Sequence, residues 1–339
     1  MKFATLGELM LRLSTPGNER FSQAQQFDIN FGGGEANVAV SLANYGCDAC
    51  FLSKLPENDL GDAALNSLRT FGVDTSRILR GGKRLGVYYL ETGAAMRPSK
   101  VIYDRADSAI AQAKAEEFDF DSLLEGVEWL HISGITPALS LSAREITKNA
   151  LIKAKEKGIT VSFDLNFRKK LWSKEEAQAC LVPLMKYVDY VIGNEEDAQN
   201  CLGFHLDNDV TSGKLDSAQY GAMLKALCET YGFKGAATSL RESFSASHNG
   251  WSGALYINGE FHLAKHYDIE PIVDRVGSGD SFSAGLIYGL THLEDPQKAI
   301  EFAVAASALK HTIPGDYNRV KLEEVKTLMA GDGSGRVQR

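Results

Sequence analysis

Residues 274–285 read Asp-Arg-Val-Gly-Ser-Gly-Asp-Ser-Phe-Ser-Ala-Gly, a glycine turn that opens into an apolar run of helical character. Gly277 and Gly279 allow the backbone to curl, so the first turn of the helix would present several unpaired N–H groups. Such a helix start binds anions, because the free N–H groups and the positive end of the helix dipole act together. The stretch therefore predicts an anion site formed by Gly277, Ser278 and Gly279.

Asp280 follows this turn directly. The simplest interpretation is that this carboxylate only caps the helix start, where a negative charge is favourable. Beside an anion site, however, it can also act as a general base that accepts a hydroxyl proton while a phosphoryl group is transferred. The sequence favours the second interpretation once another glycine-rich stretch is considered.

That second stretch is Phe31-Gly32-Gly33-Gly34-Glu35-Ala36-Asn37, which also precedes a helical pattern. Its glycines allow a ligand to approach the backbone closely. Neither G-x-G-x-x-G nor G-x4-G-K-[ST] occurs in the chain, and this absence argues against a dinucleotide oxidoreductase and a P-loop kinase.

Between and around the two stretches, short β-type runs alternate with longer helical patterns. This alternation is typical of βαβ units and predicts an α/β fold with a mostly parallel sheet. Strands are expected at residues 3–6, 51–55, 129–134, 160–164 and 190–193, and helices at 35–45, 59–71, 140–157, 174–187, 217–231, 281–290 and 296–310.

Three segments depart from this pattern because their apolar and polar residues alternate with period two. They are residues 27–31, 86–91 and 101–105. Such alternation predicts a half-buried antiparallel sheet. We expect a small β-sheet lid, formed by excursions at approximately 12–32 and 84–106 from a single domain that spans residues 1–339.

The composition indicates a cytoplasmic enzyme. The 339 residues carry 36 Lys and Arg against 44 Asp and Glu, a formal net charge of −8. No apolar run is long enough for a membrane helix, and an early Glu8 argues against a secretory signal. The acidic balance argues against a nucleic-acid partner. Cys47 and Cys50 form a C-x-x-C pair, which we interpret as two packing residues since no further zinc ligands follow.

Gly33-Gly34-Glu35-Ala36-Asn37 and residues 274–285 resemble the two signatures of the PfkB (ribokinase-like) family of sugar kinases, in the expected order and separation. Within the family the resemblance is greatest to kinases of 2-keto-3-deoxygluconate, through residues 130–140, 163–168 and 171–173. The resemblance implies a three-layer α/β/α core with a mostly parallel sheet and a small lid. It also implies ATP-dependent phosphorylation of a terminal sugar hydroxyl with Mg²⁺.

The same resemblance suggests roles for individual residues. Asp280 is similar to the catalytic base, and Gly277, Ser278 and Gly279 to the anion hole. The expected substrate-binding residues are Gly33, Gly34, Asn37, Tyr89, Tyr103, Arg105 and Arg168. The residues themselves support the cations, because a sugar carboxylate calls for the planar bidentate donor that arginine provides. Surface ion pairs for the arginines and lid packing for the tyrosines remain the alternatives.

On the nucleotide side, Asn194-Glu195-Glu196-Asp197 resembles the family's N-x-x-E element, with a shorter acid in the last place. Each of the three acids, Glu195, Glu196 and Asp197, is therefore a candidate for Mg²⁺ through water. The expected ATP-binding residues are Asn194, Ser239, Arg241, Gly277 and Gly279, although Arg241 could equally be a surface cation. Asp274 is the candidate for a monovalent cation site such as one for K⁺.

Several alternatives stay open at this stage. Other substrates within the family are 2-keto-3-deoxygalactonate, 5-keto-2-deoxygluconate and fructose. A sugar- or nucleotide-binding regulator on a kinase scaffold is a different class of function. The aromatic lid strands also favour a homo-oligomer formed through the lid, because an exposed apolar sheet invites pairing.

Overall fold

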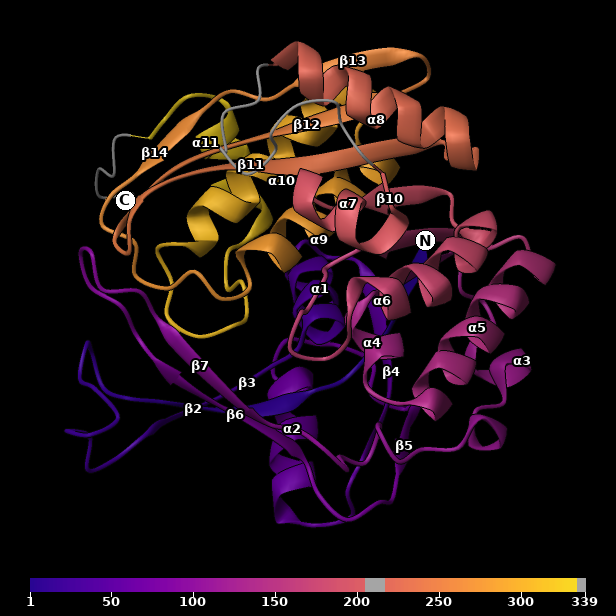
Figure 1. The fold of residues 1–339 in the computed structure, drawn as a ribbon, viewed down its shortest axis with the longest axis vertical. Helices are drawn as coiled ribbons and strands as arrows, with labels where there is room; N and C mark the ends of the chain where they lie inside the picture. The colour runs from indigo at the N-terminus through magenta and orange to yellow at the C-terminus, as the bar shows by residue number, and fades with distance from the viewer. Residues whose placement is uncertain (205–216, 334–339) are drawn as a thin grey trace.

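The strands expected from the sequence lie side by side in one large sheet, in a computed structural model that describes residues 1–204 and 217–333 (Figure 1). The parallel part follows the order β11-β10-β9-β8-β1-β4-β5. Its strands are β1 (Lys2–Leu6), β4 (Asp48–Leu55), β5 (Ile78–Arg80), β8 (Trp129–Ser133), β9 (Thr160–Asp164), β10 (Tyr190–Ile192) and β11 (Gly235–Ser245). The predicted α/β class and the mostly parallel sheet are confirmed.

An antiparallel extension completes one edge of this sheet and was not predicted. It consists of β12 (His248–Ile257), β13 (Glu260–Leu263) and β14 (Tyr267–Ile269), which continue from β11. Asn258 and Gly259 join β12 to β13 with φ values of 54° and 84°. Asn-Gly is the preferred pair for a two-residue hairpin, so the sequence did contain a signal for this turn.

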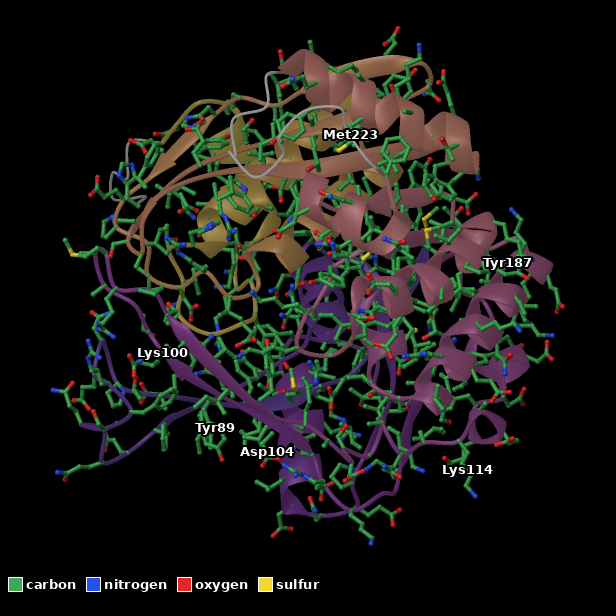
Figure 2. The ribbon with its side chains drawn as sticks, viewed as in Figure 1. Tyr89, Lys100, Asp104, Lys114, Tyr187 and Met223 are labelled. Carbon is green, nitrogen blue, oxygen red and sulfur yellow. The ribbon has the colours of Figure 1, made fainter. Side chains whose placement is uncertain are left out.

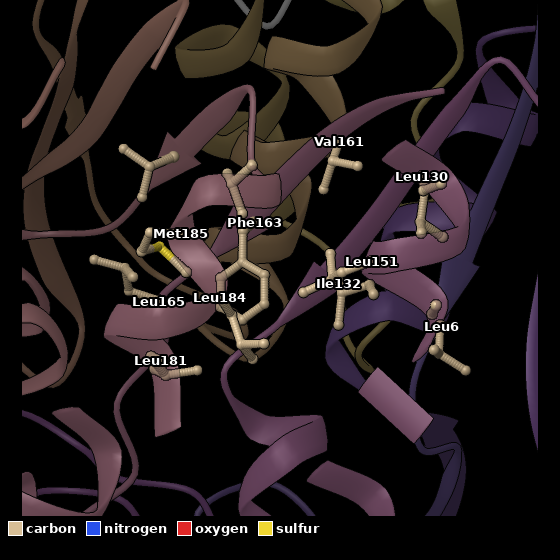
Figure 3. Close-up of a cluster of buried hydrophobic side chains, with 14 of the residues drawn as sticks. Leu6, Leu130, Ile132, Leu151, Val161, Phe163, Leu165, Leu181, Leu184 and Met185 are labelled. Atoms are coloured by element: carbon tan, nitrogen blue, oxygen red, sulfur yellow. The ribbon is translucent and has the colours of Figure 1, made fainter. Parts of the chain in front are cut away.

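Helices cover both faces of the large sheet (Figure 1). Phe3 and Trp129 pack into one core, whereas Ala4 and Leu130 pack into the other, as expected for strands buried on both faces. One layer contains α1 (Gly34–Asn44), α2 (Asp59–Arg69), α9 (Ser278–His292), α10 (Pro296–Lys310) and α11 (Leu322–Met329). The other contains α3 (Phe120–Leu123), α4 (Ile135–Ala138), α5 (Leu141–Glu156), α6 (Lys174–Leu181), α7 (Glu195–Leu202) and α8 (Ser217–Tyr231). Figure 3 shows the core under the second layer, where Phe163 lies among leucines of the strands and helices.

Two of the expected helices differ from the sequence prediction by three residues or more at one end. The helix expected over 174–187 ends as α6 at Leu181 and continues as a 3-10 helix, Val182–Tyr187. Pro183 accounts for the change, because proline lacks the N–H group that a continuing α-helix requires. Helix α9 begins at Ser278 rather than 281, so the glycine turn itself forms the helix start.

The lid is a separate four-stranded sheet that projects from the lower left of the body in Figure 1. Its order is β3-β2-β6-β7, with strands β2 (Met10–Ser14), β3 (Asp28–Gly32), β6 (Gly86–Glu91) and β7 (Lys100–Asp104). Strand β2 was not predicted, although Leu11, Arg12, Leu13 and Ser14 alternate between apolar and polar residues. It pairs in parallel with β6 and antiparallel with β3, and so ties the two excursions together.

All five cysteines are free. Burial raises the pKa of Cys47 and of Cys50 to about 11, the opposite of what a redox pair needs. Both thiols pack against apolar cores, in agreement with the structural interpretation. Among the described residues, no helix is both long and apolar enough to cross a membrane.

Candidate active site

A cleft of about 590 Å³ lies between the lid sheet and the carboxyl ends of the parallel strands. Asp164 and Ile192 end β9 and β10, where ligands of open α/β sheets bind, and Ser239 lies in β11 two residues past its last pair with β10. The cleft brings together nearly all of the predicted site residues: Gly33, Gly34, Asn37, Tyr103, Arg105, Arg168, Asn194, Glu196, Asp197, Ser239, Arg241, Gly277, Ser278, Gly279 and Asp280.

The glycine turn before α9 has the shape that an anion site requires. Gly277 caps the helix with φ 84°, in the left-handed region. A Cβ at this position would lie 2.1 Å from the carbonyl oxygen of Asp316, so only glycine fits. A Cβ on Gly279, in contrast, would meet no atom within 4 Å, and its backbone lies open to the cleft. The Ser278 amide already donates to the carbonyl oxygen of Arg275 at 3.2 Å, so the next N–H groups of α9, those of Gly279 and Asp280, are the ones available to a phosphoryl group.

Asp280 lies in the first turn of α9, and its carboxylate faces the start of α1. Asn37 Nδ2 donates a hydrogen bond of 2.6 Å to Asp280 Oδ2, while Asn37 Oδ1 accepts from the amide of Gly33. Burial raises the pKa of Asp280 to about 6, against the lowering effect of the Asn37 hydrogen bond. A carboxylate with this pKa is ionised at neutral pH and remains basic enough to accept a proton.

The start of α1 is held in place by a buried carboxylate that the sequence analysis did not assign. Glu35 Oε1 accepts hydrogen bonds from the amide and hydroxyl of Ser133 and from the hydroxyl of Thr136. A Cβ on Gly34 would lie 3.5 Å from Asp280 Oδ1, in ordinary van der Waals contact, so the Gly34 backbone lies next to the base. These contacts position the Gly33–Gly34 backbone directly opposite Asp280.

The lid contributes Tyr88 to the cleft, and the prediction of Tyr89 was wrong. Tyr88 pairs across the sheet with Tyr103, and both line the cleft, whereas Tyr89 pairs with Ile102. Successive residues of a strand point to opposite faces, so Tyr89 lies on the outer face, where it contacts Phe27. Figure 2 shows Tyr89 on the side of the lid that points away from the body.

The two predicted arginines differ in how far they are already paired. Arg105 is buried, and its Nε donates to Glu8 Oε2 at 2.8 Å, with a second contact from Nη2 to the same oxygen. Arg168 is exposed, donates to the carbonyl oxygen of Phe167 at 3.3 Å, and forms no ion pair with the side chains that the structure describes. Arg168 is therefore the freer cation of the two.

A second hollow of about 750 Å³ adjoins the cleft between β7 and the loop after β9. Basic side chains outnumber acidic ones in its lining, with Arg105, Arg168, Lys169, Lys170 and Lys174 against Glu175, Glu196 and Asp197. Lys170 Nζ also donates to the lid at the carbonyl oxygen of Val101. This cationic hollow could accept the acidic end of an extended ligand.

The predicted nucleotide and metal residues Asn194, Glu196 and Asp197 line the cleft, and Glu196 and Asp197 also border the second hollow. Asn194 and Asp197 form a reciprocal cap at the start of α7, and Asp197 Oδ1 also accepts from the amide of Phe167. Both Asp197 oxygens thus accept from backbone amides, while the residue still lines the cleft. Glu196 is exposed and lines the cleft, and the side chain of Glu195 lies outside what the structure describes.

Asp164 is an acidic cleft residue that the sequence analysis did not select. Burial raises its pKa well above the ordinary range, and the nearby Asp197 and Asp280 add to this. The one hydrogen bond that its carboxylate makes within the described chain is a contact of 3.3 Å from Ser283 Oγ. A carboxylate at the carboxyl end of a buried parallel strand was the signal that could have identified it.

A buried ionic network, also unforeseen, joins the lid to the glycine turn. Arg12 of β2 contacts Asp274 Oδ2 at 2.6 Å and Asp316 Oδ1 at 3.0 Å, and the hydroxyl of Tyr88 donates to Asp316 Oδ2. Asp274 in turn accepts from the amides of Val276 and Gly315. The lid sheet is thereby anchored to the two segments that carry the anion site.

Comparison with known proteins finds relatives along nearly the whole chain. A family model described as pfkB family carbohydrate kinase matches residues 2–321. The crystal structure of a 2-dehydro-3-deoxygluconokinase from Thermotoga maritima is 51% identical, with 98% of each chain covered and a TM-score of 0.94. A 2-dehydro-3-deoxygalactonokinase from Haloferax volcanii is 35% identical over 98% of both chains. A 2-dehydro-3-deoxygluconokinase from Bacillus subtilis is 26% identical over 94% of this chain and 92% of its own.

Proposed function

Because the chain belongs to the pfkB family of carbohydrate kinases, we propose that it transfers the γ-phosphoryl group of ATP to the terminal hydroxyl of 2-keto-3-deoxygluconate. The observation that carries the proposal is the geometry around Asp280. A carboxylate with a raised pKa stands between an open helix start and the bare backbone of Gly34. A hydroxyl that rests on Gly34 would meet the base on one side and the phosphoryl group on the other.

In the proposed reaction, Asp280 accepts the proton of the terminal hydroxyl as the sugar oxygen forms its bond to the γ-phosphorus. The bond between that phosphorus and the bridging oxygen breaks, and ADP leaves with the electron pair. Charge on the transferring group is stabilised by the N–H groups at the Gly277–Gly279 turn. Arg241 and Ser239, which line the cleft on the β11 side, are proposed to contact the nucleotide together with Asn194.

Mg²⁺ is the proposed metal cofactor, and it would neutralise charge on the β- and γ-phosphates. Mg²⁺ generally keeps several water ligands and needs few protein carboxylates. Asp164, whose carboxylate has no cation partner among the described residues, fits this demand, as does the exposed Glu196. We propose that these two acids hold the water ligands of the metal.

An acidic substrate is supported by the charge of the second hollow. Arg168 retains donors that no described side chain pairs with, and Lys169 lies beside it. A guanidinium can bind a carboxylate through two parallel charge-assisted hydrogen bonds. We therefore assign the sugar carboxylate to Arg168, with Arg105 and Glu8 as a preformed pair that shapes the wall of the site.

Replacement of Arg168 tests the substrate class. Arg168→Ala is expected to raise KM for 2-keto-3-deoxygluconate about 10- to 100-fold, since it removes a charged hydrogen-bonding pair. Arg241→Ala is the matched control on the nucleotide side, and it should raise KM for ATP instead. The measurement is a coupled assay of ADP release over both substrates. Equal turnover of neutral fructose by the unmodified enzyme would show that the carboxylate is not recognised.

The same assay decides between epimers. The relatives carry names of both gluconate- and galactonate-type kinases, and these acids differ at one hydroxyl-bearing carbon. We propose the gluconate type, following the relative with 51% identity. A higher kcat/KM for 2-keto-3-deoxygalactonate or 5-keto-2-deoxygluconate would replace this assignment and leave the reaction class intact.

We further propose that the enzyme acts in the cytoplasm, where ATP is available and its five free cysteines stay reduced.

We also propose that two copies of the chain associate through the outer face of the lid. Ile29 and Ile102 are 67% and 54% exposed on that face, and Phe27 is 41% exposed beside them. Ile29→Lys with Ile102→Lys is expected to halve the mass measured by analytical ultracentrifugation, from dimer to monomer. Leu141→Lys, at a leucine 78% exposed on the body, is the control that should leave the mass unchanged. A monomeric unmodified protein would contradict the proposal.

A further inference from the structure

Lys310 is the last residue of α10, and its side chain is fully buried, with 0% exposure. A buried ammonium group loses its hydration, so it needs specific polar partners in the interior. None of the proposed catalytic steps uses Lys310, and it does not line the cleft. Its position in the fold therefore calls for a separate explanation.

The partners of Lys310 are backbone carbonyl oxygens. Its Nζ donates to the carbonyl oxygen of Ile313 at 3.0 Å and to that of Asp274 at 3.5 Å. No carboxylate of the described chain lies within ion-pair distance of Nζ, because the side chains of Asp274 and Asp316 are taken up by Arg12. The ammonium thus lies between two carbonyl oxygens, the type of ligand that proteins also use for monovalent cations.

The two carbonyl groups belong to the segments that shape the anion site. Asp274 lies three residues before Gly277, and Ile313 lies three residues before Asp316, whose own carbonyl oxygen packs against Gly277. The Cε atom of Lys310 is 3.4 Å from where a Cβ on Gly277 would be. Lys310 therefore links the two segments directly beneath the glycine turn, without reaching the phosphoryl group.

The residues around Asp274 do not fit a diffusible monovalent cation. Such an ion would need the carbonyl oxygens that Nζ already contacts, and the carboxylate of Asp274 is occupied by Arg12 and by the amides of Val276 and Gly315. Together with Arg12, Lys310 balances the two buried carboxylates, so an added cation would leave the cluster with excess positive charge.

We propose that the ammonium of Lys310 is a tethered cation that holds the glycine turn in its anion-binding shape and replaces a dissociable monovalent ion. Lys310 is in this sense a positioning residue. The proposal rests on the proposed kinase function, and it makes the enzyme independent of K⁺. Removal of the side chain down to Cβ should leave a cavity bordered by carbonyl oxygens that a small cation can enter.

The test compares Lys310→Ala with Lys310→Met in Mg²⁺-containing buffers whose only other monovalent cation is tetramethylammonium. Lys310→Ala should lower kcat about 10- to 100-fold, because the turn is displaced, and NH₄⁺ or K⁺ should restore at least part of it. Lys310→Met fills the same space without a charge, so it should lose activity and gain none from either cation. The unmodified enzyme should show the same kcat with and without K⁺ when the ionic strength is held constant. A K⁺ concentration of about 100 mM is suitable, because it is close to physiological ionic strength.

Melting temperatures provide a readout that does not depend on the sugar. NH₄⁺ should raise the melting temperature of Lys310→Ala and leave that of Lys310→Met and of the unmodified protein unchanged relative to tetramethylammonium. Activation of the unmodified enzyme by K⁺, or a Lys310→Ala variant that responds to neither cation in activity or melting, would overturn the proposal. Failure of the proposed function would look different: the unmodified enzyme would phosphorylate no sugar acid, while the melting experiment could still succeed.

Discussion

Asp280→Asn is expected to lower kcat about 10²- to 10⁴-fold, the range that a positioned general base contributes. The amide keeps the shape of the carboxylate but cannot accept the hydroxyl proton. KM for both substrates should change little, because Asp280 does not carry the charge recognition assigned to Arg168. The measurement is the coupled assay at saturating sugar acid and ATP, with equilibrium binding of ATP as a check that the site is intact.

The melting temperature separates lost chemistry from lost folding. Burial raises the pKa of Asp280 to about 6, so the folded chain holds this proton more tightly than the unfolded chain does. The ionised carboxylate therefore costs stability as the pH rises from about 4 through 6, by about 2 to 3 kcal/mol at neutral pH. Asp280→Asn removes that cost and should melt no lower than the unmodified protein. Undiminished phosphorylation by this variant would refute the base, and a regulator without activity would then become the leading alternative.

The pH profile gives a second view of the same group. Because the ionised form of Asp280 is the active one, kcat/KM should fall as the pH drops below about 6. The Asn37 hydrogen bond lowers the pKa of Asp280, so Asn37→Ala should move this acid limb to higher pH.

Chemistry that lies in one continuous stretch could be predicted from the sequence. Gly277, Gly279 and Asp280 are neighbours in the chain, and their geometry follows from a single helix start. The start of α1 at Gly34 could be placed for the same reason. Such local features can be predicted without the tertiary structure, because a turn and a helix cap depend on residues a few positions apart.

Residue choices that depend on register could not be made with the same certainty. Tyr88 and Tyr89 are equally plausible from the sequence, but a shift of one residue moves a strand's side chains to the other face. The pairing of β6 with β7 selects Tyr88 for the cleft. In the same way, the commitment of Arg105 to Glu8 links residues 97 positions apart and leaves no local signal.

The ionic network under the lid could not be predicted from the sequence for a further reason. Arg12 and Asp316 are 304 positions apart, and Arg12 lies in a strand that was not predicted. Lys310 resembled an ordinary basic residue at a helix end, a place where cations are favoured anyway. Only the packing of α10 against the glycine turn distinguishes it.

Arg12→Met is expected to destabilise the protein by about 3 to 5 kcal/mol, the cost of breaking a buried ionic network by removing one partner. Arg12 is 3% exposed and holds both Asp274 and Asp316, so its loss leaves two buried carboxylates with Lys310 as the remaining nearby cation. Urea denaturation, followed by circular dichroism, measures the free energy of unfolding. The effect on activity should appear as a lower kcat as well, because the lid and the glycine turn lose their common anchor.

Arg84→Met is the matched control, since Arg84 is a second arginine beside the lid that pairs with an aspartate. Its partner Asp104 is solvent-exposed, and an exposed pair of this kind contributes about 0 to 1 kcal/mol. If both variants lose the same small amount of stability, Arg12 does not carry the network.

A double-mutant cycle measures the coupling between Arg12 and Asp316. Asp316→Asn removes one of the carboxylates that Arg12→Met leaves unpaired. The two changes together should therefore cost less than the sum of their separate costs, by about 1 to 3 kcal/mol. If the two losses of stability simply add, Arg12 and Asp316 do not stabilise each other. The lid strand would then not be coupled to the segment that packs against the anion site.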